Sequence, residues 1–158
     1  MIGILAHHGT CRDFDRFDGE RLGSFNPGAT CRLGFFLSAD PRIAAHFTLR
    51  VDVLEQGYDS EEGSIALIED PFRFDPDPFE DGARVLECEL ALNNPRRLAL
   101  RDWMELVARD DPGEVDRLRR RLLRDGHDGI LVPAWDGDHS ALGKEEDVPC
   151  VEYRADTW

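Results

Sequence analysis

Residues 34–47 read GFFLSADPRIAAHF. The apolar start of this stretch favours a short buried strand, which we place at residues 33–37. Ser38-Ala39-Asp40-Pro41 follows with an N-cap candidate and a proline at the first helical position, a combination typical of a helix start. We therefore predict a helix over residues 41–51, entered directly from a strand.

The rest of the chain mixes short strands with separate helices. Strands are expected at residues 2–5, 85–92, 130–132 and 150–153, where apolar residues run together or alternate with polar ones. One short helix is expected from a cap at Asp102 to Val107, and a longer one from Asp111-Pro112 to Asp125-Gly126. Because no repeat and no regular strand-helix alternation is present, we predict an α+β fold in a single domain over residues 1–158.

Three segments lack a regular pattern. Residues 11–29 read as an ordered loop pinned by Phe14, Phe17 and Phe25. Residues 55–82 form an acidic excursion that prolines interrupt, and residues 135–147 form a polar loop. Specificity for a partner is expected in the last two segments, because loops commonly carry it.

The charge of the chain limits its partners. Its 158 residues include 33 Asp plus Glu against 19 Lys plus Arg, a formal net charge of −14. Such a surface disfavours sequence-independent binding to nucleic acid and docking on anionic lipid, so a protein partner is favoured and no membrane partner is expected. Arginines near the motifs described below remain available for a pyrophosphate: Arg12, Arg32, Arg42 and Arg154.

The spacing of the cysteines bears on metal binding, and the amino-terminal residues bear on the location of the protein in the cell. The four cysteines lie far apart without a Cys-x-x-Cys pair, which disfavours a zinc ribbon and a disulfide framework. The aspartates near Gly19 do not complete a calcium loop, and His7, His8 and Cys11 lack a partner pair, so no metal is expected. No signal peptide or membrane span is indicated, so a cytoplasmic location is expected, although delivery into another cell would leave no mark here.

Three small groups of residues could carry chemistry. His8-Gly9-Thr10 follows the first strand, Phe36 and Phe47 could sandwich a flat heterocycle, and Glu152 interrupts an apolar terminal strand. Taken singly, each has a simpler structural explanation. The histidine could be a hydrogen-bonded structural residue, the two phenylalanines could belong to the core, and the glutamate could lie on an exposed strand face.

Together, the order and spacing of these groups resemble the ADP-ribosyltransferase superfamily. The resemblance is closest to small bacterial and phage domains of polyvalent proteins, related to the poly(ADP-ribose) polymerase branch. It rests on His8-Gly9-Thr10, on Gly34-Phe35-Phe36-Leu37-Ser38 with Ala44-Ala45-His46-Phe47, and on the terminal Glu152-Tyr153. Two further segments, residues 90–95 and 126–132, are similar to later landmarks of the family, so the resemblance spans most of the chain.

The resemblance implies a split β-sandwich that binds NAD⁺ as a substrate. His8, Gly9 and Thr10 would bind the dinucleotide, with His8 on a ribose hydroxyl and the Gly9 backbone on the nicotinamide carboxamide. Phe36 and Phe47 would stack on the nicotinamide ring. Glu152 would be the catalytic carboxylate that stabilises positive charge on the ribose as nicotinamide leaves.

This chain departs from the family pattern at two positions. Phe36 stands where a tyrosine is usual, and Ala44 stands where a serine is frequent. Each change removes a hydroxyl and would weaken NAD⁺ binding by about 1 kcal/mol if relatives use that hydrogen bond. Neither change removes the carboxylate.

The sequence therefore leaves three readings of function. The first is an enzyme, such as a toxin or effector, that transfers ADP-ribose from NAD⁺ to a macromolecular acceptor or to water. The second is a catalytically degenerate NAD⁺ or ADP-ribose binding module that acts through protein interaction. The third is an acidic mimic of nucleic acid, disfavoured because the densest carboxylates fall in one proline-broken segment. Cys150 stands where arginine-modifying relatives often have Gln or Glu, which disfavours arginine as the acceptor.

Overall fold

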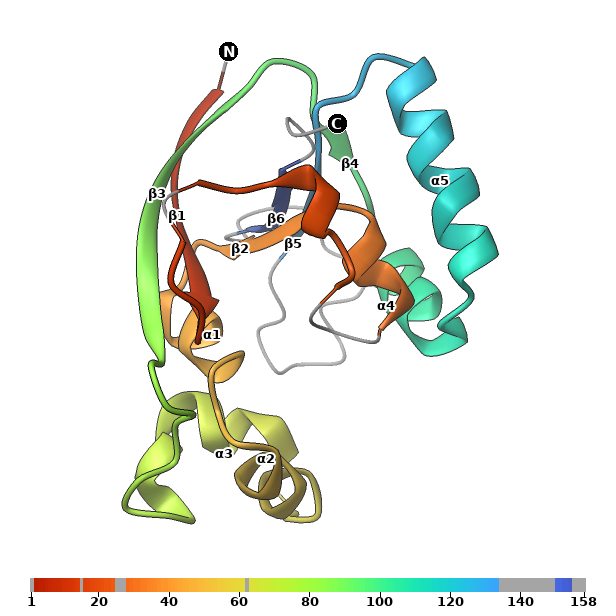
Figure 1. Ribbon diagram of the computed structural model, residues 1–158. Helices are drawn as coiled ribbons and strands as arrows, with labels where there is room; N and C mark the ends of the chain where they lie inside the picture. Colours follow the sequence, from red (N-terminus) through yellow and green to blue (C-terminus); the bar gives the residue numbers. More distant parts are fainter. Residues whose placement is uncertain (1, 15, 25–27, 62, 134–149, 155–158) are drawn as a thin grey trace.

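The computed structural model describes residues 2–14, 16–24, 28–61, 63–133 and 150–154. Helices pack around a sheet whose strand order is β3-β1-β2-β6-β5-β4 (Figure 1). Neighbouring strands are antiparallel except β4 and β5, which are parallel. This mixed architecture is compatible with the predicted α+β class. The strands are β1 Ile2–Thr10, β2 Phe35–Ser38, β3 Arg84–Leu92, β4 Arg96–Arg97, β5 Gly129–Pro133 and β6 Cys150–Arg154.

The first strand is longer than its apolar residues predict. It continues through the polar His7 and His8 to Thr10, because β3 supplies a partner at every position from Ile2↔Leu92 to Thr10↔Arg84. The motif His8-Gly9-Thr10 therefore forms the last three residues of β1, whereas the sequence predicted that it follows the strand. The predicted strand at residues 85–92 is confirmed, and its exposure alternates along β3 as expected for a strand with one buried face.

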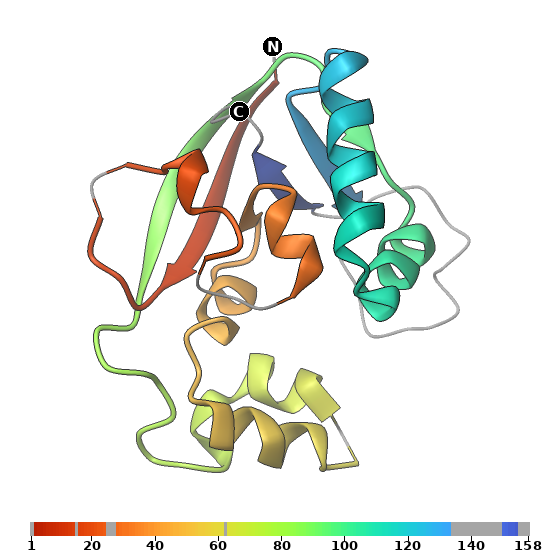
Figure 2. The ribbon, with the colours of Figure 1, turned by 45° about the vertical axis from the view of Figure 1, so that its right-hand side comes forward.

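Helices α4 (Leu100–Arg109) and α5 (Pro112–Arg124) lie together beside the β5 end of the sheet (Figure 2). Asp111 caps α5 as predicted, because its side chain accepts a hydrogen bond from the Gly113 amide at 2.8 Å. The predicted cap of α4 at Asp102 is wrong. The Trp103 amide bonds to the Ala99 carbonyl at 3.0 Å, so the helix begins earlier and Asp102 lies in its first turn.

The predicted helix over residues 41–51 divides into two. Helix α1 (Pro41–His46) begins at the predicted cap Asp40, but α2 (Val51–Tyr58) is a separate helix. The chain between them leaves helical geometry because its backbone pairs with the returning segment. The Glu80 amide bonds to the Thr48 carbonyl, and the Arg50 amide to the Pro78 carbonyl, both at 2.9 Å.

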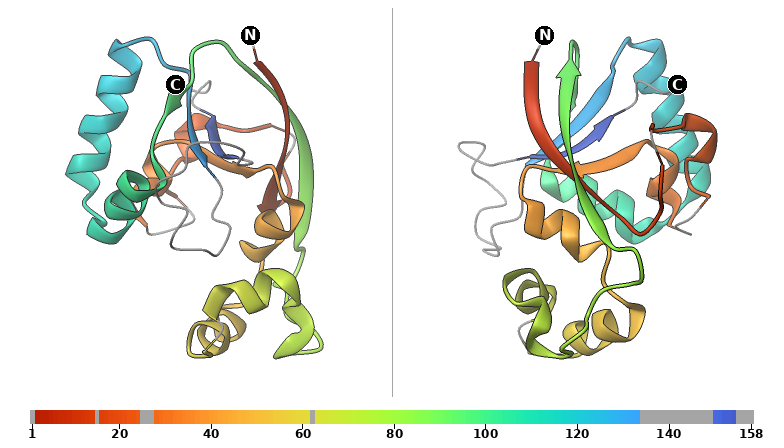
Figure 3. Two further views of the ribbon diagram at one scale, coloured as in Figure 1. Left: turned by 180° about the vertical axis from the view of Figure 1, so that it is seen from behind. Right: turned by 60° about the vertical axis from the view of Figure 1, so that its left-hand side comes forward.

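The acidic excursion predicted over residues 55–82 is largely ordered, and its first part is helical. It contains the second half of α2, helix α3 (Gly63–Glu69) and the short turn η3 (Pro71–Arg73). Arg50 supplies much of the order, because its guanidinium bonds Asp52 at 2.8 Å and Asp75 at 2.9 Å. A hydrophobic cluster of the buried residues Leu49, Val53 and Leu67 joins α2 to α3. Figure 3 shows these two helices below the sheet, apart from α4 and α5.

Two segments that the sequence presents separately are joined in the structure. The Asp128 carboxylate accepts hydrogen bonds from the amides of Asn93 at 2.5 Å and Asn94 at 3.0 Å. The His127 ring donates to the Asn94 carbonyl at 2.9 Å. The turn after β3 is therefore attached to the entry of β5, and β5 pairs with β6, which in turn pairs with β2.

Candidate functional site

The joint between β1 and β2 is the part of the sheet where the motif residues meet. Within the described residues the two strands share a single registered pair, His7↔Ser38. Beyond this pair, a side chain takes over the contact between the strands, because His8 Nδ1 donates a hydrogen bond to the Phe36 carbonyl at 2.7 Å. The facing edges of the two strands thus separate next to Gly9.

His8 is held as a neutral imidazole. Burial lowers its pKa, and the hydrogen bond to the Phe36 carbonyl opposes that shift only in part. With Nδ1 acting as the donor, Nε2 of the neutral ring is a hydrogen-bond acceptor. This is the form to which the hydroxyl of a ligand can donate a hydrogen bond.

Two loop aromatics enclose His8 and were not predicted as site residues. The imidazole centroid lies 5.1 Å from the Phe17 ring and 6.0 Å from the Phe14 ring, both in edge contacts. Phe17 also contacts Phe35 at 4.9 Å. The only signal in the sequence was the recurrence of phenylalanine in an Asp-rich loop, which indicated order but not a position beside His8.

Gly9 lets α1 pack directly on β1. A Cβ atom at this position would lie 1.8 Å from the Ala44 carbonyl oxygen, so no larger residue fits without movement of the helix. The adjacent Thr10 hydroxyl is used locally, because it accepts a hydrogen bond from the Arg12 amide at 3.0 Å. Within this motif, His8 and the Gly9 backbone are therefore better placed for a ligand than the Thr10 side chain.

Phe36 and Phe47 face one another at the end of α1. Their centroids are 6.3 Å apart and the rings are inclined by 49°. Phe36 is anchored by Trp103 at 6.1 Å, whereas Phe47 is 55% exposed. A heterocycle between parallel rings needs a separation of about 7 Å, twice the usual carbon contact distance. A ligand would therefore enter by rotation of Phe47.

The backbone of Glu152 lies at the centre of β6. Its register partners are Leu37 in β2 and Leu131 in β5. Because β2 separates β6 from β1, position 152 lies about two strand spacings, or roughly 10 Å, from β1. The sheet thus brings positions 8, 36 and 152 onto three adjacent strands although they are far apart in the sequence.

Two of the arginines expected to meet a pyrophosphate are engaged with carboxylates. Arg32 forms a two-pronged pair with Asp116 at 3.0 and 2.9 Å, and Arg42 bonds Asp40 at 2.6 Å. These pairs lower the pKa of both aspartates. A pyrophosphate would have to compete with them. Of the two segments expected to set specificity, residues 135–147 lie outside the described residues.

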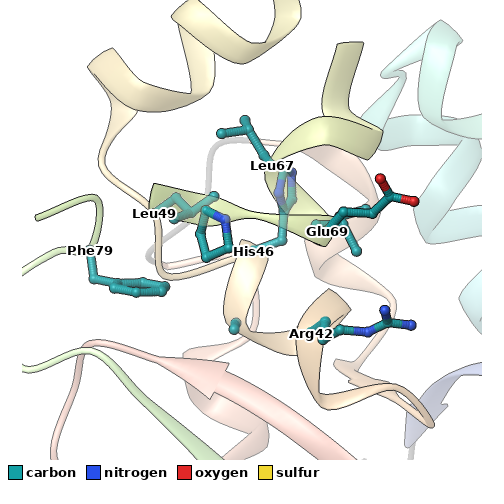
Figure 4. Close-up of a pocket in the computed structure, with 9 residues that line it drawn as sticks. Arg42, His46, Leu49, Leu67, Glu69 and Phe79 are labelled. Carbon is teal, nitrogen blue, oxygen red and sulfur yellow. The ribbon is translucent and has the colours of Figure 1, made fainter. Parts of the chain in front are cut away.

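A small pocket lies on the other side of α1, between α1 and α3 (Figure 4). Its volume of about 120 Å³ is well below that of a usual ligand site, roughly 300–1,000 Å³. It is lined by none of residues 8, 9, 36 or 47, so it is distinct from the β1–β2 joint. The His46 ring stands in it, and among the described residues its buried Nδ1 has no hydrogen-bond partner.

The two partly buried histidines His8 and His46 predict a pH dependence of stability. Burial lowers the pKa of His8 and of His46 below their ordinary value near 6.5. The unfolded chain therefore binds more protons than the folded one as the pH falls below about 6.5, and the free energy of unfolding should decrease there. Each histidine can contribute a slope of at most about 1.4 kcal/mol per pH unit.

Urea unfolding at pH 7.5, 6.5 and 5.5 measures this slope. We expect His46→Gln, which removes one of the two groups, to flatten it. An equal slope in wild type and His46→Gln would contradict the assignment.

Comparison of the chain with protein-family models, with curated proteins and with solved structures finds no match. Within the ranges that the structure describes, no group of three or more His, Cys, Asp or Glu residues is arranged to hold a metal ion. No described helix is long and apolar enough to cross a membrane.

Proposed function

We propose that the chain is an NAD⁺-dependent ADP-ribosyltransferase that acts on a macromolecular acceptor. The observation that supports this most is the separation of β1 from β2, where His8 bonds the Phe36 carbonyl and Gly9 contacts α1. The Phe36–Phe47 ring pair adjoins this joint at the end of α1, whereas the His8 ring packs against Phe14 and Phe17. A split β-sandwich is part of the same proposal. The fold places Glu152 one strand further along the sheet from Phe36.

In the proposed reaction, the bond between the nicotinamide nitrogen and the ribose breaks, and nicotinamide leaves as a neutral molecule. Positive charge develops on the ribose during this step. The Glu152 carboxylate would stabilise that charge, because a fixed anion acts where the charge appears in the transition state. His8 Nε2 would accept a hydrogen bond from a ribose hydroxyl, and an acceptor nucleophile or water would then attack the ribose carbon.

The test is release of nicotinamide after mixing the protein with NAD⁺, followed by chromatography. A parallel reaction with labelled NAD⁺ in a cell lysate asks whether the label enters protein, RNA or DNA. We expect nicotinamide release and label in protein. Release without label would indicate hydrolysis of NAD⁺.

A binding module without catalysis is the second candidate. Phe36 and Ala44 lack the hydroxyls common in the family, and the Ala44 carbonyl is packed against Gly9. Calorimetry with NAD⁺ and ADP-ribose separates the candidates. Binding without nicotinamide release supports the module, and absence of binding contradicts both.

Substitution of Phe47 tests the stacking role. We expect Phe47→Ala to raise the Kd for NAD⁺ about tenfold, because a ring contact contributes on the order of 1 kcal/mol beyond its buried area. Stability should change little, since the side chain is 55% exposed. Phe72→Ala is the matched control, because Phe72 is 57% exposed and lies in η3. An equal Kd in both variants would exclude Phe47 from the site.

A further inference from the structure

The helices and returning segment over residues 51–82, here named the acidic appendage, carry most of the charge of the protein. This segment has eleven Asp or Glu residues and a single basic residue, Arg73, and so contributes −10 of the net charge of −14. Figure 2 shows α2 and α3 projecting from the rest of the fold. The charge is therefore concentrated on one projecting part of the molecule.

An apolar ridge crosses this acidic surface. It consists of Phe47, Val51 and Tyr58, whose side chains are 55%, 64% and 58% exposed. Val51 and Tyr58 are seven residues apart in α2 and so share one helical face. The opposite face, with Val53 and Gly57, is buried against α3. The ridge thus combines the outer side of α2 with Phe47 at the end of α1, and it is not part of the core.

Carboxylates border one side of the ridge. At 100° per residue, Glu55 lies about 40° around α2 from Val51, and Asp59, the C-cap residue of α2, lies about 80° from Val51 in the same direction; both are exposed. Neither has a salt bridge within the described part of the chain. An apolar stripe bordered by unpaired negative charge is complementary to a segment with apolar anchors between lysines or arginines.

Ring contacts connect this ridge to the candidate site. The Tyr58 ring lies 6.3 Å from His46, His46 lies 6.2 Å from Phe47, and Phe47 lies 6.3 Å from Phe36. The His46 Nε2 atom is also 3.4 Å from the Tyr58 hydroxyl. A partner on the ridge would therefore lie next to the proposed nicotinamide position.

We propose that the ridge of Phe47, Val51 and Tyr58, with the flanking Glu55 and Asp59, docks a basic amphipathic segment of a partner protein. As the docking surface of the acceptor it rests on the proposed function, but the docking itself does not require NAD⁺. The negative charge disfavours nucleic acid and anionic lipid as occupants. The apolar side chains supply anchors that a purely electrostatic contact would lack.

The probe is a synthetic helical peptide of lysine and leucine with leucines at three- and four-residue spacing. A peptide with glutamate in place of lysine and a short DNA duplex are the comparison probes. Binding is measured by fluorescence anisotropy without NAD⁺, at low and at physiological salt. We expect the lysine peptide to bind and the glutamate peptide and the duplex not to bind.

Two pairs of variants locate the surface. We expect Tyr58→Ser to weaken peptide binding at least fivefold, whereas Met104→Ser, which changes a similarly exposed residue of α4, leaves it unchanged. The double variant Glu55→Gln with Asp59→Asn should weaken binding threefold to tenfold and reduce its salt dependence. A double variant with the same charge change elsewhere, Glu20→Gln with Glu89→Gln, should not.

The outcomes distinguish this inference from the proposed function. Equal binding by Tyr58→Ser and Met104→Ser, or preference for DNA, would overturn the docking surface whatever the enzyme does with NAD⁺. Peptide binding that follows the expected variants, together with no nicotinamide release, would retain the docking surface and contradict the proposed enzyme.

Discussion

Replacement of Glu152 by alanine is expected to lower the rate of nicotinamide release from NAD⁺ about a hundredfold to a thousandfold. The reason is that a preorganised charge acting on the transition state commonly contributes this much. The affinity for NAD⁺ should change far less, because the ground-state ribose is neutral. Nicotinamide release at saturating NAD⁺, with the Kd measured separately, distinguishes the two effects.

Two further variants, Glu152→Gln and Glu89→Gln, complete this experiment. Glu152→Gln keeps the shape of the side chain and removes its charge, so nicotinamide release should be nearly as slow as in Glu152→Ala. Glu89 is an exposed residue of β3, and its substitution should leave the rate unchanged. Full activity of Glu152→Ala would remove the carboxylate from the proposed mechanism.

Gly9→Ala should have the largest effect on stability of the glycine substitutions in β1. Its Cβ would lie 1.8 Å from the Ala44 carbonyl oxygen and 2.8 Å from the Ala44 carbonyl carbon, and these are backbone atoms that a rotamer change cannot move. Overpacking of this kind costs about 1–3 kcal/mol or more. Since 1 kcal/mol shifts the Tm of a chain of this size by about 2–4 °C, a decrease of about 2–12 °C is expected.

Gly3→Ala is the matched control in the same strand. A Cβ there would meet no atom within 4 Å, so its Tm should stay close to that of the wild type. Thermal unfolding by circular dichroism measures both variants. If Gly9→Ala is as stable as Gly3→Ala, α1 does not pack on β1 as described. If Gly9→Ala is destabilised as expected, calorimetry of this variant with NAD⁺ reports whether movement of α1 also weakens binding.

Local signals in the sequence predicted several elements correctly. Asp40 and Asp111 are both caps, because a short carboxylate before a proline satisfies free helix amides through contacts within a few residues. Val115 and Leu122 are buried on one face of α5, and Gly126 adopts a positive φ of 77° at its end. These features depend on near neighbours in the chain, and the sequence contains that information directly.

Other elements depend on distant partners and were predicted wrongly. The first strand continues past Leu5 because β3 pairs with it, and the helix after Asp40 ends at His46 because residues 78–80 pair with residues 48–50. The second half of the helix over residues 51–58 was predicted as part of the acidic excursion. Arg50 binds Asp75 of this segment across 25 residues of sequence, and it also binds the neighbouring Asp52.

The candidate site shows the same contrast between local signals and distant contacts. Order and spacing in the sequence were enough to name its candidate residues, because each motif is a local pattern; these are His8, Gly9, Phe36, Phe47 and Glu152. The arrangement of these residues in space could not be predicted in this way. The enclosure of His8 by Phe14 and Phe17, and its bond to the Phe36 carbonyl, arise where a loop and two strands meet.

By itself, the sequence determined the residue types, the negative charge, the caps of α1 and α5, and the candidates for NAD⁺ chemistry. Only the tertiary structure decided that β1 and β2 separate after His7↔Ser38, and that α1 packs on Gly9. It alone also connected the acidic appendage to Phe36 through ring contacts. The physical reason is that hydrogen bonds, burial and ring packing between distant segments form only when the chain closes on itself, whereas capping and helical periodicity act within a few residues.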